Sequence, residues 1–400
     1  MQNADCRIKI QFRVSSLKLK PETQNLKPET IYSEICNPKS EINMSLRIDR
    51  LIYQKEKSFW IKMLLSPLYL FSLPYEGAVR ARALFYTIGL KKSKRLPCPV
   101  ISVGNITVGG TGKTPLVMAL ARGLMDRGIP VAILSRGYKG KKTSGPLVSD
   151  GQMVFLSPEE SGDEPFLMAK FLKGVPIIVG KDRFANGQMA LQRFGIRGLL
   201  LDDGYQHLQL HRDLNILLID SHIGFGDHHL LPRGILREPL THLCRAHLFL
   251  LTKVEHPETC QPLEAKLHQI HPSSPVFHSH YEPLGLIGPE EEWEELHSLK
   301  GKKALVFSGI ANPKHFSSLL KKCGMEIVKE LIFPDHHLYT SKDLASLEKQ
   351  GKGVDWFVTT EKDMVKLIRL NIGHLPIRSL RIEVRIWEEE EFYQRVLEIF

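Results

Sequence analysis

The 400-residue sequence lacks three patterns that would place it in common classes of protein. Its cysteines form no Cys-x-x-Cys pair and show no metal-ligand spacing, which favours reduced thiols in a cytosolic protein; they stand at positions 6, 36, 98, 244, 260 and 323. The uncharged stretch 63–75 is too short to span a bilayer, which needs about 20 apolar residues. The N-terminus lacks the apolar core and small-residue cleavage site of a secretory signal.

The sequence also shows no nucleic-acid-binding signature, although it is basic. Net charge is +10 at pH 7, and residues 46–100 contain eleven Lys or Arg against three Asp or Glu. This local excess indicates an anionic partner, and we favour a membrane surface over nucleic acid; solvated surface side chains are the plain alternative. With 42% hydrophobic residues, the chain has enough apolar material for a large core, and its length favours two or three domains.

The N-terminal quarter divides into two regions. Residues 1–45 are polar and without sustained periodicity, which predicts a disordered extension, with Met44 as an alternative initiator. Residues 46–96 form a predicted amphipathic, membrane-associating region, interrupted by Pro67 and Pro74. Its large apolar residues recur at helical spacing: Trp60, Leu64, Leu68, Phe71 and Tyr75. A helix packed on the catalytic domain explains the same spacing, and the sequence alone does not choose between the two.

Cys98–Leu116 reads as a strand, a loop rich in Gly and Thr, and a helix, which is the P-loop arrangement. In that arrangement Lys113 reaches the β- and γ-phosphates and Thr114 ligates Mg²⁺. The strict pattern has Gly at the position of Thr107. A Gly-rich turn that binds nothing is the alternative.

Further apolar runs predict an α/β fold: a parallel-sheet P-loop domain over 97–289 and a smaller α/β domain over 290–400. Strands are expected at 131–134, 175–179, 198–201, 214–219, 247–251, 304–307, 326–328 and 355–359. The acidic patch from Glu290 to Glu295 is interpreted as a linker, or as a solvated helix face.

Several polar residues carry possible chemistry. Asp202 and Asp203 follow an apolar strand, as in a Walker B element, and would hold Mg²⁺; a turn or helix cap is the alternative. Asp163 opens a helix, where it is either an N-cap or the carboxylate that orients an acceptor hydroxyl. Arg237 can bind phosphate, and His336 is a possible acid/base residue in a loop.

Taken together, the motifs resemble the tetraacyldisaccharide 4′-kinase family. Those motifs are VGNITVGGTGKTP, SRGY, GDEP, DDGYQH, LLPRGILREP, FSGIANP, FPDHH and VTTEKD, over roughly residues 50–400. The resemblance implies ATP- and Mg²⁺-dependent phosphorylation of the 4′-hydroxyl of tetraacyldisaccharide 1-phosphate, giving lipid IVA in lipid A biosynthesis. It also implies a peripheral enzyme at the cytoplasmic face of the bacterial inner membrane, and a monomer is expected.

The resemblance also assigns residues. It implies nucleotide contacts from Thr107, Val108, Gly109, Gly110, Thr111, Gly112, Lys113 and Thr114, and Mg²⁺ ligation by Thr114, Asp202 and Asp203. Asp163 matches the family's proposed base, His336 its supporting histidine, and Arg237 the arginine near the phosphates. The chain departs from the family pattern at Asp227-His228-His229, at Arg233 and at Ile235, which affects expected acceptor contacts.

Two rival functions are weighed. A dimeric partitioning or metal-insertion ATPase carries a lysine where this chain has Val108, which counts against that class. A P-loop kinase of a soluble alcohol fits the loop equally well, but the apolar, cation-flanked segment 59–95 favours a lipid acceptor.

Overall fold

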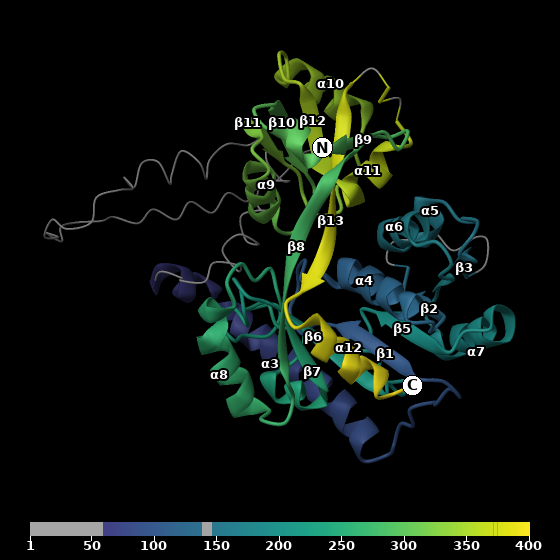
Figure 1. The fold of residues 1–400 in the computed structure, drawn as a ribbon. Helices are drawn as coiled ribbons and strands as arrows, with labels where there is room; N and C mark the ends of the chain where they lie inside the picture. Colours follow the sequence, from purple (N-terminus) through teal and green to yellow (C-terminus); the bar gives the residue numbers. More distant parts are fainter. Residues whose placement is uncertain (1–58, 138–145, 371, 374) are drawn as a thin grey trace, which may run out of the picture. The chain divides into compact units, whose positions relative to one another are not determined.

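The computed structural model describes residues 59–137, 146–370, 372–373 and 375–400 (Figure 1). The predicted disordered extension, residues 1–45, and Tyr138 of the SRGY motif lie outside the described residues.

Within the described residues, thirteen strands form one mixed sheet in the order β11-β10-β12-β13-β8-β7-β6-β1-β5-β2-β4-β3, with β9 paired to β8. All neighbouring pairs are parallel except β3 with β4, and β8 with β13 and β9. The strands are β1 Val100–Gly104, β2 Val131–Ser135, β3 Leu147–Ser149, β4 Ile177–Val179, β5 Gly198–Asp202, β6 Leu214–Asp220, β7 Leu248–Thr252, β8 Val276–Ile287, β9 Trp293–Glu295, β10 Lys303–Ser308, β11 Glu326–Ile332, β12 Trp356–Thr360 and β13 Ile377–Ile386. The parallel α/β fold is therefore confirmed.

Helices cover the sheet, as buried parallel strands require. They are α3 Phe59–Thr87, α4 Lys113–Asp126, α5 Pro158–Ser161, α6 Asp163–Phe171, α7 Arg183–Phe194, α8 Gln261–Ile270, α9 Pro313–Lys322, α10 Ser341–Gln350, α11 Glu361–Leu367 and α12 Glu389–Leu397, with 3-10 turns at Leu240–Arg245, Pro257–Cys260 and Leu296–Leu299.

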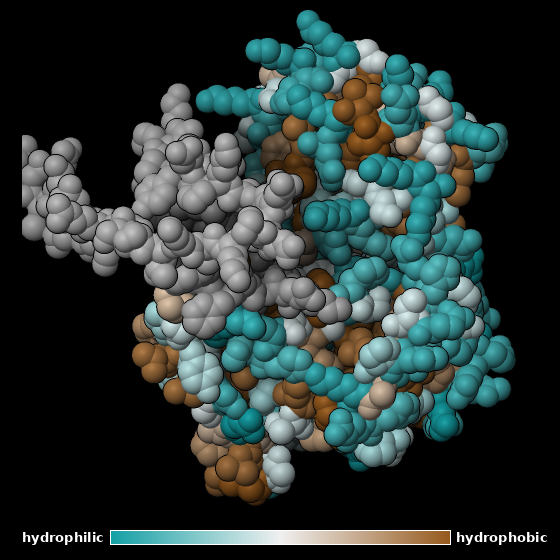
Figure 2. Space-filling view, turned by 90° about the vertical axis from the view of Figure 1, so that its left-hand side faces the viewer, coloured by the Kyte–Doolittle hydropathy of each residue, from teal (hydrophilic) through white to brown (hydrophobic). Residues whose placement is uncertain are grey.

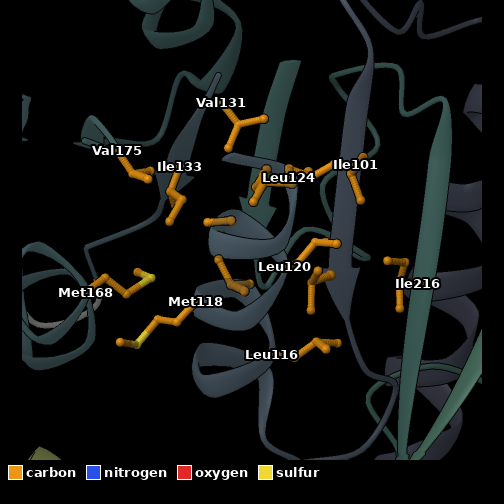
Figure 3. Packing of buried hydrophobic residues seen from close by; sticks show 14 of the residues in the cluster. Ile101, Leu116, Met118, Leu120, Leu124, Val131, Ile133, Met168, Val175 and Ile216 are labelled. Atoms are coloured by element: carbon orange, nitrogen blue, oxygen red, sulfur yellow. The ribbon is translucent and has the colours of Figure 1, made fainter. Parts of the chain in front are cut away.

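Helix α4 organises the largest hydrophobic cluster. Leu116, Leu120 and Leu124 recur every four residues and are buried against the central strands, including Ile101 of β1 (Figure 3). Met118 points the other way, toward Met168 of α6 (Figure 3). This packing anchors the helix that begins directly after the phosphate loop, so the loop sits on a rigid support.

Helix α3 continues through both prolines, so our expectation that Pro67 and Pro74 interrupt it was wrong. A proline inside a helix leaves the carbonyl four residues earlier without its usual N–H partner. At Pro67 that carbonyl belongs to Met63, and the Ser66 hydroxyl donates a 2.7 Å hydrogen bond to it. A neighbouring serine therefore replaces the missing bond.

The two faces of α3 differ. Leu65 and Ser72 are buried, and the Ser72 hydroxyl donates to the Leu230 carbonyl at 3.1 Å. Other large apolar side chains of the helix are exposed: Met63, Tyr69, Leu70, Phe71, Leu73, Leu84 and Phe85. In Figure 2, brown hydrophobic groups gather on the lower part of the face in view, the level at which α3 lies in Figure 1. The helix thus packs on the protein and also presents an apolar face. Among the described helices, none has the length and apolar character needed to cross a membrane.

Two long strands, β8 and β13, were not predicted. The first residues of β8 pair with β7, and the remainder pairs antiparallel with β13. Their apolar pattern is broken by charged residues and Pro283, and some of these charges pair across the strands, as Arg385 does with Glu282 at 2.7 Å. The helix alternative for the acidic patch was wrong, because Trp293–Glu295 forms β9. The division at residue 290 stays a prediction; β8 lies within the first predicted domain, but most of it pairs with β13 of the second.

Candidate active site

The phosphate loop lies between β1 and α4, as the sequence predicts. Gly109 and Gly112 both have positive φ, of 106° and 86°. Gly112 is constrained a second time, because a Cβ atom there would lie 2.1 Å from the Tyr281 hydroxyl. Any side chain at Gly112 would therefore clash as well as strain the backbone.

The first part of the loop is paired with the segment that carries Arg237. Thr107 is buried and forms an antiparallel bridge with Leu236. The Val108 N–H donates to the Ile235 carbonyl at 2.8 Å, and the Arg237 N–H donates to the Ile106 carbonyl at 2.7 Å. Backbone pairing therefore brings Arg237 beside the phosphate loop, although more than 100 positions separate them along the chain.

Lys113 points back across the loop. Its Nζ lies 3.2 Å from the Asn105 side-chain oxygen and 3.5 Å from an Asp203 carboxylate oxygen. Asn105 is buried, and its side-chain amide donates to the Thr111 hydroxyl at 2.9 Å. Asn105 was not among the predicted site residues; its place directly after an apolar strand is the signal that could have pointed to it.

The pKa values of the two adjacent aspartates at the end of β5 are shifted in opposite directions. Burial, reinforced by Glu164 and Asp203, raises the pKa of Asp202 to about 7, although the Ser135 hydroxyl donates to it at 2.9 Å. Burial would also raise the pKa of Asp203, but Lys113 and Arg237 outweigh it and hold that pKa below its ordinary value. The Arg237 guanidinium lies 3.2 Å from both Asp203 carboxylate oxygens.

These carboxylates suit a hard divalent cation. The Asp202 Oδ1 atom is fully buried and has no hydrogen-bond partner among the described residues. Thr114, in the first turn of α4, supplies a buried hydroxyl to the same cavity. Mg²⁺ is held by one or two carboxylates together with waters and substrate phosphates, so it needs no larger protein cage. Among the described residues, no group of three or more His, Cys, Asp or Glu is placed to hold a metal.

Arg183 supports the aspartates from behind and was missed at the sequence level. It is the first residue of α7 and is 3% exposed. Its guanidinium donates to the Asp202 carbonyl at 2.7 Å and the Asp203 carbonyl at 3.4 Å. Asp203 itself has a positive φ of 48°, a conformation that these bonds help to hold. No spacing in the sequence marks Arg183.

Lys253 fixes the other side of the loop. It is buried, has a φ of 60°, and donates from Nζ to the Gly110 carbonyl at 2.8 Å. The same ammonium forms a buried ion pair with Asp220 at the end of β6. The polar groups after β6 and β7 thus support the loop's backbone.

Asp163 and His336 come together from distant parts of the chain. Asp163 is the first residue of α6, and its carboxylate lies 3.5 Å from Nδ1 of His336. Gly162 occupies the N-cap position, so the N-cap alternative for Asp163 was wrong. Burial would raise the pKa of Asp163, but His336, Lys366 and Lys362 outweigh it, and the carboxylate stays ionised at neutral pH.

Lys362 of the VTTEKD motif orders this pair. Its Nζ lies 3.3 Å from Nε2 of His336 and 3.2 Å from Glu164. An ammonium group only donates hydrogen bonds, so the contact requires a lone pair on Nε2. The ring proton is then on Nδ1, where it faces Asp163.

A cavity of about 630 Å³ joins these groups. Its lining residues include Lys113, Thr114, Asp202, Asp203, Arg237 and His336. Asp163 is not among the described lining residues, but it contacts His336, which is. The phosphate loop, the two aspartates after β5 and His336, with its contact to Asp163, therefore meet around one space.

Comparison with known proteins agrees with this arrangement. The family described as tetraacyldisaccharide-1-P 4′-kinase matches residues 62–400. This chain belongs to that family. The tetraacyldisaccharide 4′-kinase of Syntrophus aciditrophicus is 44% identical over 343 residues, which cover 82% of this chain and 91% of that protein. A similarly named protein from Pelobacter propionicus is 44% identical over 315 residues, covering 77% and 85%. The structure of LpxK from Aquifex aeolicus in complex with ATP is 36% identical, with a TM-score of 0.68 over 84% of this chain and 99% of that one.

Two of the departures from the family pattern compensate each other. The Arg233 guanidinium donates to the Asp227 carboxylate at 2.8 Å, and both side chains are largely buried. The backbone N–H of Arg233 donates to the Ser72 hydroxyl on α3 at 3.2 Å. The two departing side chains therefore form an ion pair within the loop after β6, and the backbone of the same loop is hydrogen-bonded to α3.

Proposed function

We propose that this chain is an ATP-dependent kinase that phosphorylates the 4′-hydroxyl of tetraacyldisaccharide 1-phosphate, giving lipid IVA in lipid A biosynthesis. The observation that carries the proposal is the single cavity lined both by the phosphate loop and by His336, which contacts Asp163. The description of the family names the acceptor class, a tetraacyldisaccharide 1-phosphate.

The donor end binds and neutralises the nucleotide phosphates. Lys113 and Arg237 both contact Asp203, so each is already directed at the place where phosphate charge would lie. Thr114, Asp202 and Asp203 would hold Mg²⁺, and a divalent cation there would help to offset the negative charge of the phosphates during transfer.

The acceptor end positions the attacking hydroxyl. An ionised Asp163 accepts the hydroxyl hydrogen bond and then the proton, while His336 Nδ1–H holds the carboxylate in place. Phosphoryl transfer through a loose transition state requires positioning more than a strong base, so a carboxylate of low pKa suffices.

The activity is tested with γ-radiolabelled ATP, Mg²⁺ and tetraacyldisaccharide 1-phosphate in mixed micelles. We expect labelled lipid at the 4′ position. A Lys113→Met variant is the matched control and should give no labelled lipid. Label transfer to a soluble alcohol without labelled lipid would instead support the alternative kinase.

The same proposal places the enzyme at the cytoplasmic face of the inner membrane, as a peripheral monomer. The exposed apolar face of α3, flanked by Lys62, Arg80 and Arg82, supports contact with a membrane surface. We expect a Leu70→Ser, Phe71→Ser variant to lose co-sedimentation with anionic vesicles. Leu338→Ser, which alters a comparably exposed residue outside α3, is the control and should sediment as the unmodified protein does. Equal loss in both variants would contradict a specific role for α3.

A further inference from the structure

Asp363 and Lys366 form a fully buried ion pair that the proposed mechanism does not use. Neither side chain has any exposed surface, and the Lys366 ammonium donates to Asp363 Oδ1 at 2.7 Å. Removing two charges from water costs about as much as their mutual attraction returns, so such a pair is weak evidence of stabilisation. Its role is better sought in what the pair holds in place.

The Asp363 carboxylate reaches beyond its own helix. Asp363 lies in the first turn of α11, where the Thr360 hydroxyl accepts from its backbone N–H at 3.1 Å and donates to its Oδ2 at 2.9 Å. The same Oδ2 atom accepts a 2.9 Å hydrogen bond from the backbone N–H of Gly309, which directly follows β10. Helix capping explains the contacts with Thr360 but not the one with Gly309. The carboxylate thus ties the end of β10 to the start of α11.

Gly309 in turn holds the backbone of His336. The His336 N–H donates to the Gly309 carbonyl at 3.2 Å, and His336 has a positive φ of 59°. That conformation is unfavourable for a residue with a Cβ atom and persists where neighbouring contacts hold it. The packing is tight, because a Cβ atom at Gly309 would lie 3.0 Å from the Pro334 carbonyl oxygen and 3.2 Å from His337 Cβ. Both atoms belong to the loop that carries His336.

The same helix also fixes the His336 ring. Lys362, one residue before Asp363, has its Nζ 3.3 Å from Nε2 of the ring, while Nδ1 lies 3.5 Å from the Asp163 carboxylate. Helix α11 therefore holds both the backbone and the ring of this histidine. Because a misplacement of about 1 Å can lower a rate by roughly 100-fold, small shifts of α11 should reach the acceptor end of the site.

We propose that the Asp363–Lys366 pair positions His336, acting through the backbone of Gly309. This inference rests on the proposed function, in which His336 holds the carboxylate that accepts the hydroxyl proton. A charged acceptor makes a shorter and stronger hydrogen bond to the Gly309 N–H than a neutral one does. The Lys366 ammonium offsets that charge in the protein interior. Asp363 and Lys366 are thus positioning residues and contact no substrate.

Two substitutions perturb these contacts at different points. Asp363→Asn removes the buried negative charge, whereas Gly309→Ala keeps the ion pair and forces the loop that carries His336 to move by a few tenths of an ångström. We expect each to lower kcat for tetraacyldisaccharide 1-phosphate by about 10-fold or more, with the KM for ATP unchanged. In a His336→Ala background neither should lower kcat further, because the residue that they position is absent.

Asp355→Asn is the matched control. Asp355 accepts from the backbone N–H of Lys303 at 2.8 Å, so it is tied to β10 as Asp363 is, but at the opposite end of the strand. It should leave kcat unchanged. Urea unfolding checks that each variant is folded. If Asp363→Asn does not fold, Gly309→Ala decides the question, because it leaves the buried pair intact.

A second measurement does not depend on activity. In protein with isotope-labelled histidine, the His336 ring resonances, assigned with His336→Ala, should shift in Asp363→Asn and Gly309→Ala but not in Asp355→Asn. Equal losses of kcat with and without His336 would show that the pair only stabilises the fold, and would overturn the inference. Unshifted His336 resonances in folded variants would overturn it as well. If the unmodified protein phosphorylates no lipid while the resonances shift as expected, the proposed function fails and the positioning of His336 stands.

Discussion

The two ends of the candidate site are built in different ways. The phosphate-loop end takes most of its residues from one continuous stretch, residues 105–114, with Asp202 and Asp203 from the neighbouring strand. The acceptor end brings together Asp163, His336 and Lys362, each from a different part of the chain. The first end is a local motif on a rigid junction, whereas the second depends on tertiary packing. Substitutions should therefore separate the two ends kinetically.

The largest expected effect is at Asp163. Asp163→Asn removes the proposed acceptor of the hydroxyl proton but leaves the phosphate loop intact, so we expect kcat to fall by roughly 10³-fold with the KM for ATP unchanged. Lys113→Met, at the other end, should lower kcat and also weaken ATP binding. Single-turnover rates and nucleotide titration measure the two effects. An unchanged single-turnover rate for Asp163→Asn would refute its role.

Substitution of the two neighbouring aspartates should change the free energy of unfolding in opposite directions. The folded-state pKa of Asp202 lies near 7, above its unfolded value of 3.8, so ionising this buried group destabilises the fold as pH rises through that interval. Asp202→Asn should therefore stabilise the Mg²⁺-free protein by about 4 kcal/mol above pH 7, with the gain fading toward pH 4. Asp203→Asn should destabilise it near neutral pH, since Lys113 and Arg237 lose their partner.

Urea unfolding in the presence of a chelator, at several pH values, measures both variants. A pH-independent gain for Asp202→Asn would contradict a buried carboxylate as its source. The prediction also implies that Asp202 lowers the stability of the metal-free protein and is kept because its carboxylate can bind a metal.

The smallest expected effect concerns Lys362, whose positive charge helps to lower the pKa of Asp163. Activity is lost as pH falls through that pKa, so Lys362→Met should move the acid limb of the pH–rate profile to higher pH. Lys362→Arg, which keeps the charge, should leave the limb in place. An identical profile for all three proteins would show that Lys362 has only a structural role.

The sequence alone determined the phosphate loop, the Asp202-Asp203 strand end and the family, because each is a short contiguous pattern whose chemistry follows from local residue types. It also determined most strands of the parallel sheet, since buried strands read as apolar runs. It did not reveal β8 and β13, whose charged residues are paired across the strands and so hide the apolar pattern.

Tertiary structure decided the rest. Backbone pairing with the loop brings Arg237 to the phosphate end. Burial raises the pKa of Asp202, whereas the nearby cations Lys113 and Arg237 lower that of Asp203. It also placed Arg183, Lys253 and Lys362, which support the site through contacts between residues far apart in sequence. The physical reason is that desolvation and ion pairing depend on which groups are neighbours in space, and no local spacing encodes that.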